Sequence, residues 1–320
     1  MDNIRNIQKY IAEYKSIDYS SIAEKFFTNN EDIIIWKINS VCNFRCKYCT
    51  VPSDVDERNF DLNTIKKNFN RDNKKWLIII TGGEPFLKKN FIEIIKTLTE
   101  NHYVHINTNL STSNVEEFAK KISPQNVYGL NVAAHVLERE KYDKDFKQFI
   151  KNINLLRDKG FSLFISYIFH PEMIERIERD FELFEKGGVN EVVLRPFMGT
   201  YKNKVYPNSY TVRGLEILNK YGKQEYELGS TVGIISYKDN WCLAGRRSFM
   251  IDEKGIAYRC EPLYKNGNTD SNGNFFDDSF IPDKKIKKCP LEATPCPFQC
   301  IFYSKKTHKS FFSFLSHIIK

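Results

Sequence analysis

Short apolar runs alternate with amphipathic segments between residue 33 and about residue 195. The apolar runs are rich in β-branched and aromatic residues, as expected for strands that are covered on both faces. Six strand–helix units in succession favour an α/β fold with a parallel sheet and outer helices, either a barrel or a doubly wound sheet. The predicted strands are Ile33–Ile38, Trp76–Thr81, Val104–Asn109, Tyr128–Ala133, Leu163–Phe169 and Glu191–Leu194.

The segments between these strands carry helix signals. Ser113 and Glu116 are spaced as a capping box ahead of one apolar stripe. A second stripe ends at Gly160, and a third is followed by Gly187 and Gly188, where helices commonly stop. We interpret all three stripes as core packing. They are Val115, Phe118 and Ile122; Phe146, Phe149, Ile150, Ile153 and Leu156; and Ile174, Ile177, Phe181 and Phe184.

The pattern changes after about residue 228, where the apolar pieces shorten and most of the cysteines gather. We therefore expect a lead-in segment at 1–30, a barrel at 31–228, and a smaller cysteine-rich domain with a C-terminal tail at 229–320. Within this last part, the polar stretch Lys265–Asn274 predicts a loop.

The composition is that of a globular protein, with 41% hydrophobic and 28% charged residues. No apolar run approaches the roughly 20 residues that span a bilayer, and the first residues lack a secretory signal, so we expect a cytoplasmic location without a transmembrane segment. The net charge of +8 is spread along the chain. It offers weak support for a nucleic-acid partner, and no nucleic-acid-binding module is recognisable.

Three cysteines, Cys42, Cys46 and Cys49, follow the first predicted strand with the spacing Cys-x3-Cys-x2-Cys. Three thiolates suit three irons of a [4Fe–4S] cluster and leave the fourth iron open to a non-protein ligand. The alternatives are a structural zinc site, which normally has four protein ligands, or buried free thiols. Chemistry in such sheets lies at the C-terminal ends of the strands, which is where this group falls.

The Cys-x3-Cys-x-aromatic-Cys pattern, with Tyr48 as the aromatic, resembles the signature of the radical S-adenosylmethionine (SAM) superfamily. Thr81-Gly-Gly-Glu-Pro85, after the second strand, resembles the glycine-rich SAM-binding segment of that superfamily. The resemblance implies a partial (β/α)6 TIM-like barrel in which SAM binds the open iron and is cleaved to a 5′-deoxyadenosyl radical. It also implies a reductant such as flavodoxin or ferredoxin.

The same resemblance implies a set of SAM contacts. Gly82 and Gly83 lack side chains, which would let backbone carbonyls approach the methionyl ammonium of SAM. Arg195, at the end of the sixth strand, would meet a substrate carboxylate or phosphate, or else form a buried ion pair. The cofactor-binding residues implied are Tyr48, Gly82, Gly83, Glu84, Pro85, Thr108, Asn109 and Asn131.

The second cysteine group begins with the pattern Cys-x12-Gly-x4-Cys, from Cys242 through Gly255 to Cys260. This resembles the opening of the SPASM and twitch domains, in which a hairpin turn such as Asp252–Gly255 precedes the second cysteine. Five cysteines are too few for the two auxiliary clusters of a full SPASM domain, so we expect a single auxiliary [4Fe–4S] cluster, with structural zinc as the alternative. The expected ligands are Cys242, Cys260, Cys296 and Cys300, with Cys289 as the spare cysteine.

We expect a radical SAM oxidoreductase that oxidises or rearranges a small polar metabolite, such as a sugar or an aminocyclitol. Roughly 30 residues precede the first strand, which is short for the winged-helix leader-binding domain of many peptide-modifying relatives. Modification of a peptide, by a thioether or carbon–carbon crosslink, is the alternative. A non-catalytic iron–sulfur or zinc protein is a more remote one.

Overall fold

The computed structural model describes residues 32–49, 58–144, 146–190, 192–221, 238–239, 241–242, 244–268, 270–285 and 287–291. Its main feature is a nine-stranded sheet with the strand order β12-β11-β10-β1-β2-β3-β4-β5-β6. The strands are β1 (Asp32–Asn39), β2 (Trp76–Gly82), β3 (Tyr103–Thr108), β4 (Val127–Ala133), β5 (Leu163–Phe169), β6 (Val192–Pro196), β10 (Ser248–Ile251), β11 (Ile256–Tyr258) and β12 (Ser271–Asn274).

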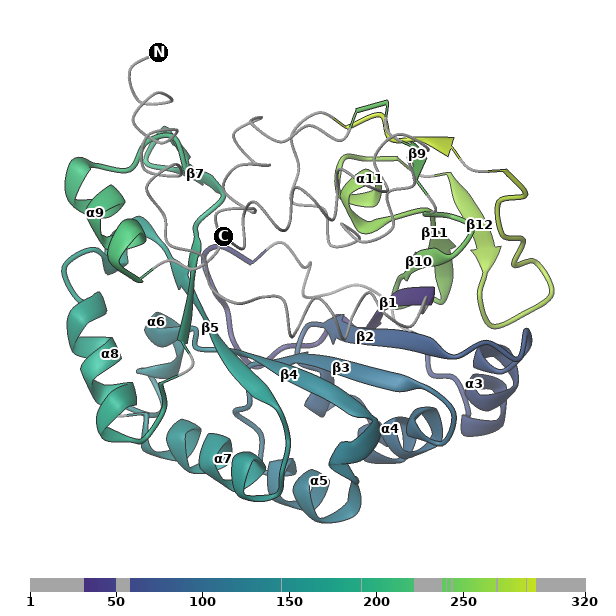
Figure 1. Ribbon diagram of the computed structural model, residues 1–320, viewed down its shortest axis with the longest axis horizontal. Coiled ribbons are helices and arrows are strands. Elements are labelled where there is room, and N and C mark those ends of the chain that lie inside the picture. The colour runs from purple at the N-terminus through teal and green to yellow at the C-terminus, as the bar shows by residue number, and fades with distance from the viewer. Residues whose placement is uncertain are drawn as a thin grey trace, which may run out of the picture.

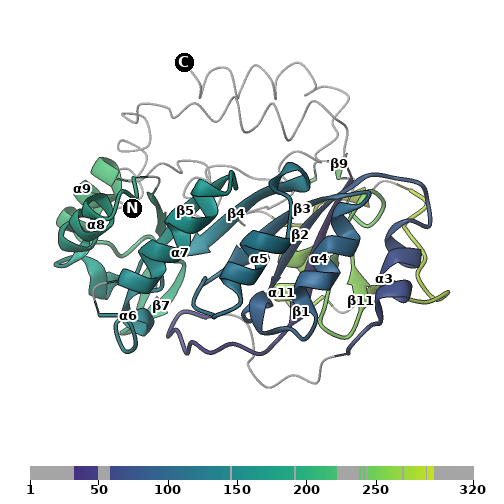
Figure 2. The ribbon, with the colours of Figure 1, turned by 90° about the horizontal axis from the view of Figure 1, so that it is seen from below.

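Strands β1 to β6 are parallel and follow chain order, and helices cover their outer face (Figure 1, Figure 2). Each strand–helix–strand crossover places the next strand beside the previous one, which gives this order. The helices are α3 (Leu62–Phe69), α4 (Phe91–Thr99), α5 (Val115–Lys121), α6 (Val136–Arg139), α7 (Lys147–Asp158), α8 (Ile177–Lys186) and α9 (Val212–Tyr221), with short 3₁₀ helices η1 (Pro85–Leu87), η2 (Pro124–Asn126) and η3 (Pro171–Met173). This is the parallel α/β architecture expected of a partial barrel.

The six predicted strands are present, each within one or two residues of the predicted ends among the described residues. Leu163–Phe169 has the predicted bounds, whereas Glu191 lies outside the described residues and β6 extends to Pro196. The helix with the second stripe ends before Gly160, and α8 is capped by Gly187, as predicted. These elements are set by local apolar periodicity, which is why the sequence predicts them well.

Alternate residues of each strand face opposite sides of the sheet. In β3, Val104 and Ile106 belong to the core between sheet and helices, while His105 and Asn107 lie on the inner face. The outer core holds large aromatic side chains such as Phe86, which is 2% exposed. Complete burial of such a ring contributes roughly 2–3 kcal/mol, so Phe86 fastens the segment that follows β2 to the core.

The C-terminal part continues the same sheet. β10 pairs with β1 in parallel, and β11 and β12 add antiparallel strands beyond it (Figure 1). The predicted turn between Asp252 and Gly255 is confirmed, because Gly255 has a φ of +88° and joins β10 to β11. The short helix α11 (Glu261–Lys265) follows, and β9 (Trp241–Cys242) pairs with β13 (Lys287–Lys288). The domain boundary at residue 228 lies outside the described residues and stays a prediction.

Two local predictions were wrong. Helix α5 begins at Val115 with Asn114 as its N-cap, and no side chain caps it, so the predicted capping box is absent. The Asn114 side chain instead donates to the Phe86 carbonyl at 2.9 Å, a contact that only the fold creates. The predicted loop Lys265–Asn274 contains β12, since pairing with β11 imposes an extended backbone that Ser-Asn-Gly-Asn does not favour by itself.

A β-hairpin of β7 (Gly199–Tyr201) and β8 (Lys204–Tyr206) follows β6 at the C-terminal end of the sheet. Within the described part of the chain, no helix is both long enough and apolar enough to cross a bilayer.

Candidate active site

The cysteine loop, residues 42–49, follows β1 and carries three thiols. The backbone N–H of Cys49 donates to the carbonyl of Cys46 at 3.0 Å, so the loop turns back between these two cysteines. Cys42 and Cys46 are half-buried, and Cys49 is exposed. Burial, followed by the charge of Glu138, raises the pKa of Cys46 to about 12. The charges of Cys49 and Cys42 add to that rise.

The donor chemistry of this loop fits a [4Fe–4S] cluster. Each thiolate would bind a different iron, so the three sulfurs need not converge on one ion. In the described ranges, no group of three or more His, Cys, Asp or Glu side chains is placed to hold a single metal ion. Burial raises the pKa of Cys42 as well as that of Cys46, so metal loading has to displace protons and is favoured at higher pH.

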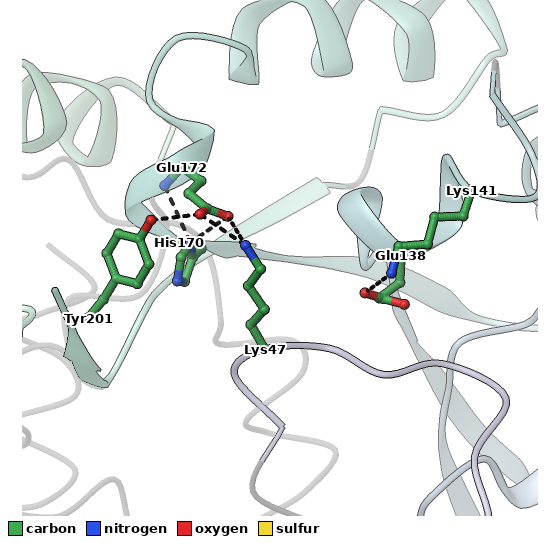
Figure 3. A network of polar contacts seen from close by, with 6 residues as sticks. All are labelled: Lys47, Glu138, Lys141, His170, Glu172 and Tyr201. Atoms are coloured by element: carbon green, nitrogen blue, oxygen red, sulfur yellow. Dashed lines mark hydrogen bonds and ion pairs between the residues drawn. The ribbon is translucent and has the colours of Figure 1, made fainter.

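Acidic side chains on two sides anchor the cysteine loop. The backbone N–H of Arg45 donates to Oε2 of Glu138, on α6, at 3.3 Å. Lys47 Nζ lies 3.1 Å from Oε1 of Glu172, in η3 after β5 (Figure 3). The Tyr201 hydroxyl, from β7, donates to the same Glu172 oxygen at 2.6 Å. Glu172 therefore joins the loop both to the end of β5 and to the β7–β8 hairpin.

Two aromatic residues of the loop pack inward, the buried Phe44 and the half-buried Tyr48. Tyr48 makes the polar contact. Its hydroxyl lies 2.9 Å from Nδ1 of His135, and its ring centroid lies 6.0 Å from that of His170. Burial raises the pKa of Tyr48 and lowers that of His135 to about 3. The His135 imidazole is therefore neutral at neutral pH and shares a hydrogen bond with the Tyr48 hydroxyl.

Gly82 and Gly83 let the segment after β2 pack directly on the chain that leads into the cysteine loop. A Cβ at Gly83 would lie 2.1 Å from the Val41 carbonyl oxygen, and one at Gly82 would lie 2.3 Å from that of Asn39. The backbone N–H of Gly83 donates to the Asn39 carbonyl at 3.0 Å. Close backbone packing thus requires both glycines, a reason that differs from the ligand approach expected from the sequence.

Glu84 is wholly buried, with 0% exposure. Its Oε1 accepts from the Thr108 hydroxyl at 2.6 Å, and its Oε2 accepts from the Asn109 backbone N–H at 2.6 Å. Burial raises the pKa of Glu84, and these hydrogen bonds act in the opposite direction. Glu84 thus joins the ends of β2 and β3, while the neighbouring Pro85 begins η1 and is also buried.

The fold brings Asn109, at the end of β3, beside the cysteine loop. Its side-chain amide donates to Oδ1 of Asn43 at 3.0 Å and lies 3.9 Å from Sγ of Cys42. Thr108, by contrast, is 3% exposed and directs its hydroxyl to Glu84. Neighbouring positions of one short motif therefore contact different parts of the site.

Arg139 is a site residue that sequence reasoning missed. Its guanidinium donates to the carbonyls of Ala133 and Ala134 at 3.2 and 2.9 Å, and also to the carbonyl of Asn109. Burial lowers its pKa to about 10, so Arg139 stays cationic at neutral pH. It holds the C-terminal ends of β3 and β4 together beside the cysteine loop. A Glu-Arg pair a few residues after a predicted strand was the available signal.

Asn131 and Arg195 lie on the inner face of the sheet, away from the cysteine loop in sequence. Oδ1 of Asn131 accepts from the Ser166 hydroxyl of β5 at 2.6 Å. Arg195, on β6, is partly buried, and its charge acts with burial to lower the pKa of His105 to about 4. The interior of the sheet is therefore polar and carries one arginine beside a neutral histidine.

The structure brings three of the C-terminal cysteines together. Burial raises the pKa of Cys260 to about 12, and the charges of Cys242 and Cys289 add to the rise. Lys287 pairs with Cys242 in the β9–β13 ladder, and Cys289 directly follows β13, so the segment with Cys289 lies beside the segment with Cys242. Cys296 and Cys300, the other two expected ligands, lie outside the described residues. The cysteine expected to be spare thus lies beside two expected ligands.

Residues 36–184 match the radical SAM superfamily, a range that runs from β1 to α8 and includes the cysteine loop. This part of the chain is therefore similar to the radical SAM domain.

Curated relatives named GTP 3′,8-cyclase match part of the chain. The probable GTP 3′,8-cyclase of Saccharolobus islandicus (strain L.S.2.15 / Lassen #1) is 25% identical over 193 residues, covering 53% of this chain and 58% of the relative. The GTP 3′,8-cyclase of Haemophilus ducreyi (strain 35000HP / ATCC 700724) is 28% identical over 177 residues, covering 52% of this chain and 46% of the relative. The chain thus spans about half the length of these relatives.

Solved structures share the fold at low sequence identity. Native anSMEcpe with bound AdoMet superposes with a TM-score of 0.55 at 18% identity, covering 77% of this chain and 78% of anSMEcpe. SuiB of Streptococcus suis bound to S-adenosylmethionine gives a TM-score of 0.57 at 14% identity, covering 80% of this chain and 67% of SuiB. Both likenesses concern the fold alone.

Proposed function

We propose that this protein is a radical SAM enzyme in which Cys42, Cys46 and Cys49 hold a [4Fe–4S] cluster and SAM binds the open iron. The observation that carries the proposal is the packing of the chain entering the cysteine loop against Gly82 and Gly83, inside the matched domain. Cys42, Cys46 and Cys49 would hold a cluster that supplies the one-electron reduction of SAM, and the 5′-deoxyadenosyl radical formed would remove a hydrogen atom from substrate.

The chain's own residues hold and tune this site. Glu138 and Glu172 fix the cysteine loop from two sides. Asn109 directs an N–H toward Cys42, and hydrogen bonds to ligand sulfurs help set the reduction potential of such clusters. Glu84 and Thr108 are buried and hydrogen-bonded to each other, so in this proposal they position the strand ends around SAM without contacting it. The remaining proposed SAM contacts are Tyr48, Gly82, Gly83, Pro85, Asn109 and Asn131.

For the substrate we propose a small polar metabolite that is oxidised or rearranged. The polar interior supports this, since Asn131, Ser166 and Arg195 offer hydrogen bonds and one positive charge for an anionic or hydroxylated molecule. The curated relatives are named for a reaction of GTP, which is such a molecule. A second candidate is peptide modification, supported by the shared fold with SuiB, one structure of which holds its precursor peptide SuiA.

We also propose a second metal centre of the twitch type in the region 229–320, an auxiliary [4Fe–4S] cluster whose ligands include Cys242, Cys260 and Cys289. The contacts that join their three backbone segments support the inclusion of Cys289. A fully cysteine-ligated cluster would accept an electron from the substrate radical, which would make the net reaction an oxidation. In a cytoplasmic setting, a flavodoxin or ferredoxin would supply the electrons for SAM cleavage.

Protein reconstituted without oxygen tests this proposal through its iron, sulfide and zinc content, with 5′-deoxyadenosine release from SAM measured on the same sample. About eight irons per chain are expected for two [4Fe–4S] clusters. About four irons with one zinc would retain the radical enzyme and exclude the auxiliary electron acceptor. Iron near zero, or a Cys42→Ala variant that still releases 5′-deoxyadenosine, would contradict the proposal. Stimulation of release by GTP or by peptides separates the two substrate classes.

A further inference from the structure

Arg259 lies at the junction of the segments that carry the C-terminal cysteines. It immediately precedes Cys260, and its Nε donates to the carbonyl of Ala244 at 3.3 Å. Ala244 follows Cys242 by two residues, and its backbone N–H donates to Sγ of Cys242 at 3.4 Å. The guanidinium therefore ties the backbone beside Cys242 to the backbone beside Cys260.

The same guanidinium also holds the third segment. Its terminal nitrogen donates to the carbonyls of Lys287 and Lys288 at 3.1 and 3.0 Å, immediately before Cys289. The carbonyl of Cys289 accepts from the backbone N–H of Asp239 at 2.8 Å, which aligns this segment with β9. One side chain thus links all three cysteine-bearing segments through backbone carbonyls, which accept from a planar fork of donors.

The fold leaves a slot for the Arg259 stem at Gly245. Gly245 has a φ of +86°, and a Cβ there would lie 3.1 Å from Cγ of Arg259 and 2.4 Å from Oδ2 of Asp283. The Gly245 carbonyl accepts from the backbone N–H of Asp283 at 2.7 Å. The stem of Arg259 is therefore confined between two backbone segments, and its guanidinium is held in place.

The charge of Arg259 acts on the thiols that it organises. The guanidinium donates to the carbonyl of Lys288, next to Cys289, and to that of Ala244, two residues after Cys242, while Arg259 itself precedes Cys260, so its positive charge lies close to all three cysteines. A cation that favours three thiolates at once favours a thiolate-bound metal centre, which carries net negative charge.

We propose that Arg259 is a positioning residue of the C-terminal metal centre: it holds the three cysteine-bearing segments together and places a positive charge beside their thiolates. This inference rests on the proposed function, because it presumes a metal centre at Cys242, Cys260 and Cys289. Net charge and hydrogen bonding around the sulfurs set the reduction potential of iron–sulfur clusters. Arg259 therefore makes the bound cluster easier to reduce as well as harder to lose.

The test compares Arg259→Gln and Arg259→Lys with Arg179→Gln in the full chain, reconstituted with iron and sulfide without oxygen. Arg179 is exposed on α8, at the other end of the sheet, and its replacement removes the same charge there (Figure 1). Metal content, resistance to a chelator and the midpoint potential of the second centre are measured. Thermal unfolding followed by circular dichroism checks that each variant is folded.

For Arg259→Gln we expect about 10- to 100-fold weaker metal binding at the second centre and a more negative midpoint potential. Arg259→Lys keeps the positive charge but lacks the planar set of N–H donors of a guanidinium. It should therefore bind metal more weakly, with a midpoint potential near that of the wild type. Arg179→Gln should match the wild type. If the centre holds zinc, which has no redox chemistry, the role of Arg259 is tested by the comparison of metal affinities alone.

Wild-type affinity and midpoint in folded Arg259→Gln would overturn the role of Arg259. The metal centre itself is tested separately by Cys242→Ser and Cys260→Ser. If these two leave the metal content unchanged, the second centre of the proposed function fails, and the role of Arg259 fails with it. If they lose metal while Arg259→Gln does not, only the role of Arg259 is wrong.

Discussion

Thr108 donates its hydroxyl hydrogen to the wholly buried carboxylate of Glu84 at 2.6 Å, which fastens the end of β3 to the segment after β2. The other oxygen of that carboxylate accepts from the backbone N–H of Asn109 at 2.6 Å, and the Asn109 side chain reaches toward Cys42. The buried carboxylate thus links the glycine-rich segment to the cysteine loop through the end of β3.

Replacement of Glu84 by Gln should lower the free energy of unfolding by about 1–3 kcal/mol, because its amide group would face a buried donor and leave it unsatisfied. SAM affinity should fall as well, since the strand ends lose their link. Urea unfolding and equilibrium dialysis with SAM measure the two effects. Glu116→Gln is the control, because Glu116 is an exposed partner of Lys120 and should change stability by less than about 1 kcal/mol. Equal effects of the two substitutions would contradict this role of Glu84.

Replacement of Gly83 by Ala should destabilise the protein by several kcal/mol and reduce iron loading. The new Cβ would lie 2.1 Å from the Val41 carbonyl oxygen, and neither backbone segment is free to move aside. Gly129→Ala is a matched control for stability, since its Cβ would meet nothing closer than 3.4 Å. Denaturant midpoints and iron content provide the comparison. If Gly83→Ala were as stable as Gly129→Ala, close packing of Gly83 against the Val41 backbone would not be required.

The ion pair between Lys47 and Glu172 should matter more for iron retention than for global stability. Exposed pairs contribute less than about 1 kcal/mol, and Lys47 is 64% exposed. Glu172 also accepts from Tyr201, so Glu172→Gln loosens the cysteine loop at two contacts. We expect faster iron loss to a chelator with nearly unchanged urea unfolding.

A double-mutant cycle of Lys47→Met and Glu172→Gln measures the coupling of the two side chains. The exposed pair of Lys120 and Glu116 supplies a control cycle that should leave iron retention unchanged. Iron loss at the wild-type rate in both single variants would contradict the anchoring role.

The stability of the protein should fall as the pH falls from about 6.5 toward 4. Burial, with the charge of Lys75, lowers the pKa of His102 to about 4, and burial with the charge of Arg195 does the same for His105. The unfolded chain binds protons at these histidines below about pH 6.5, whereas the folded chain does so only near pH 4. Below pH 6.5 the unfolded state therefore holds more protons, and stability is lost with acidification.

Urea unfolding at pH 7, 6 and 5 checks this pH dependence. Nδ1 of neutral His102 lies 3.4 Å from the backbone nitrogen of Trp76 and accepts its hydrogen, a bond that protonation removes. His102→Gln should therefore be less stable at pH 7 but show a shallower loss between pH 7 and pH 5. A slope identical to that of the wild type would contradict the assignment.

The strands and the position of the cysteine loop could be predicted from the sequence, because both depend on local features. Apolar runs such as Leu163–Phe169 specify a buried strand wherever it pairs. The spacing of Cys42, Cys46 and Cys49 places three thiols in one loop whatever surrounds it. Local signals failed where distant contacts compete with them, as at Asn114, which bonds to the Phe86 carbonyl instead of capping its own helix.

The sequence by itself determined which chemistry the chain can hold, since the thiols, the glycine pair and the order of the strands are written in short segments. The tertiary structure alone decided which partners these groups meet. It directs Glu84 inward, places β10 beside β1, and brings Arg259 to three separate cysteine-bearing segments. Such contacts join residues far apart in the chain, and their free energy comes from packing and burial that no local pattern records.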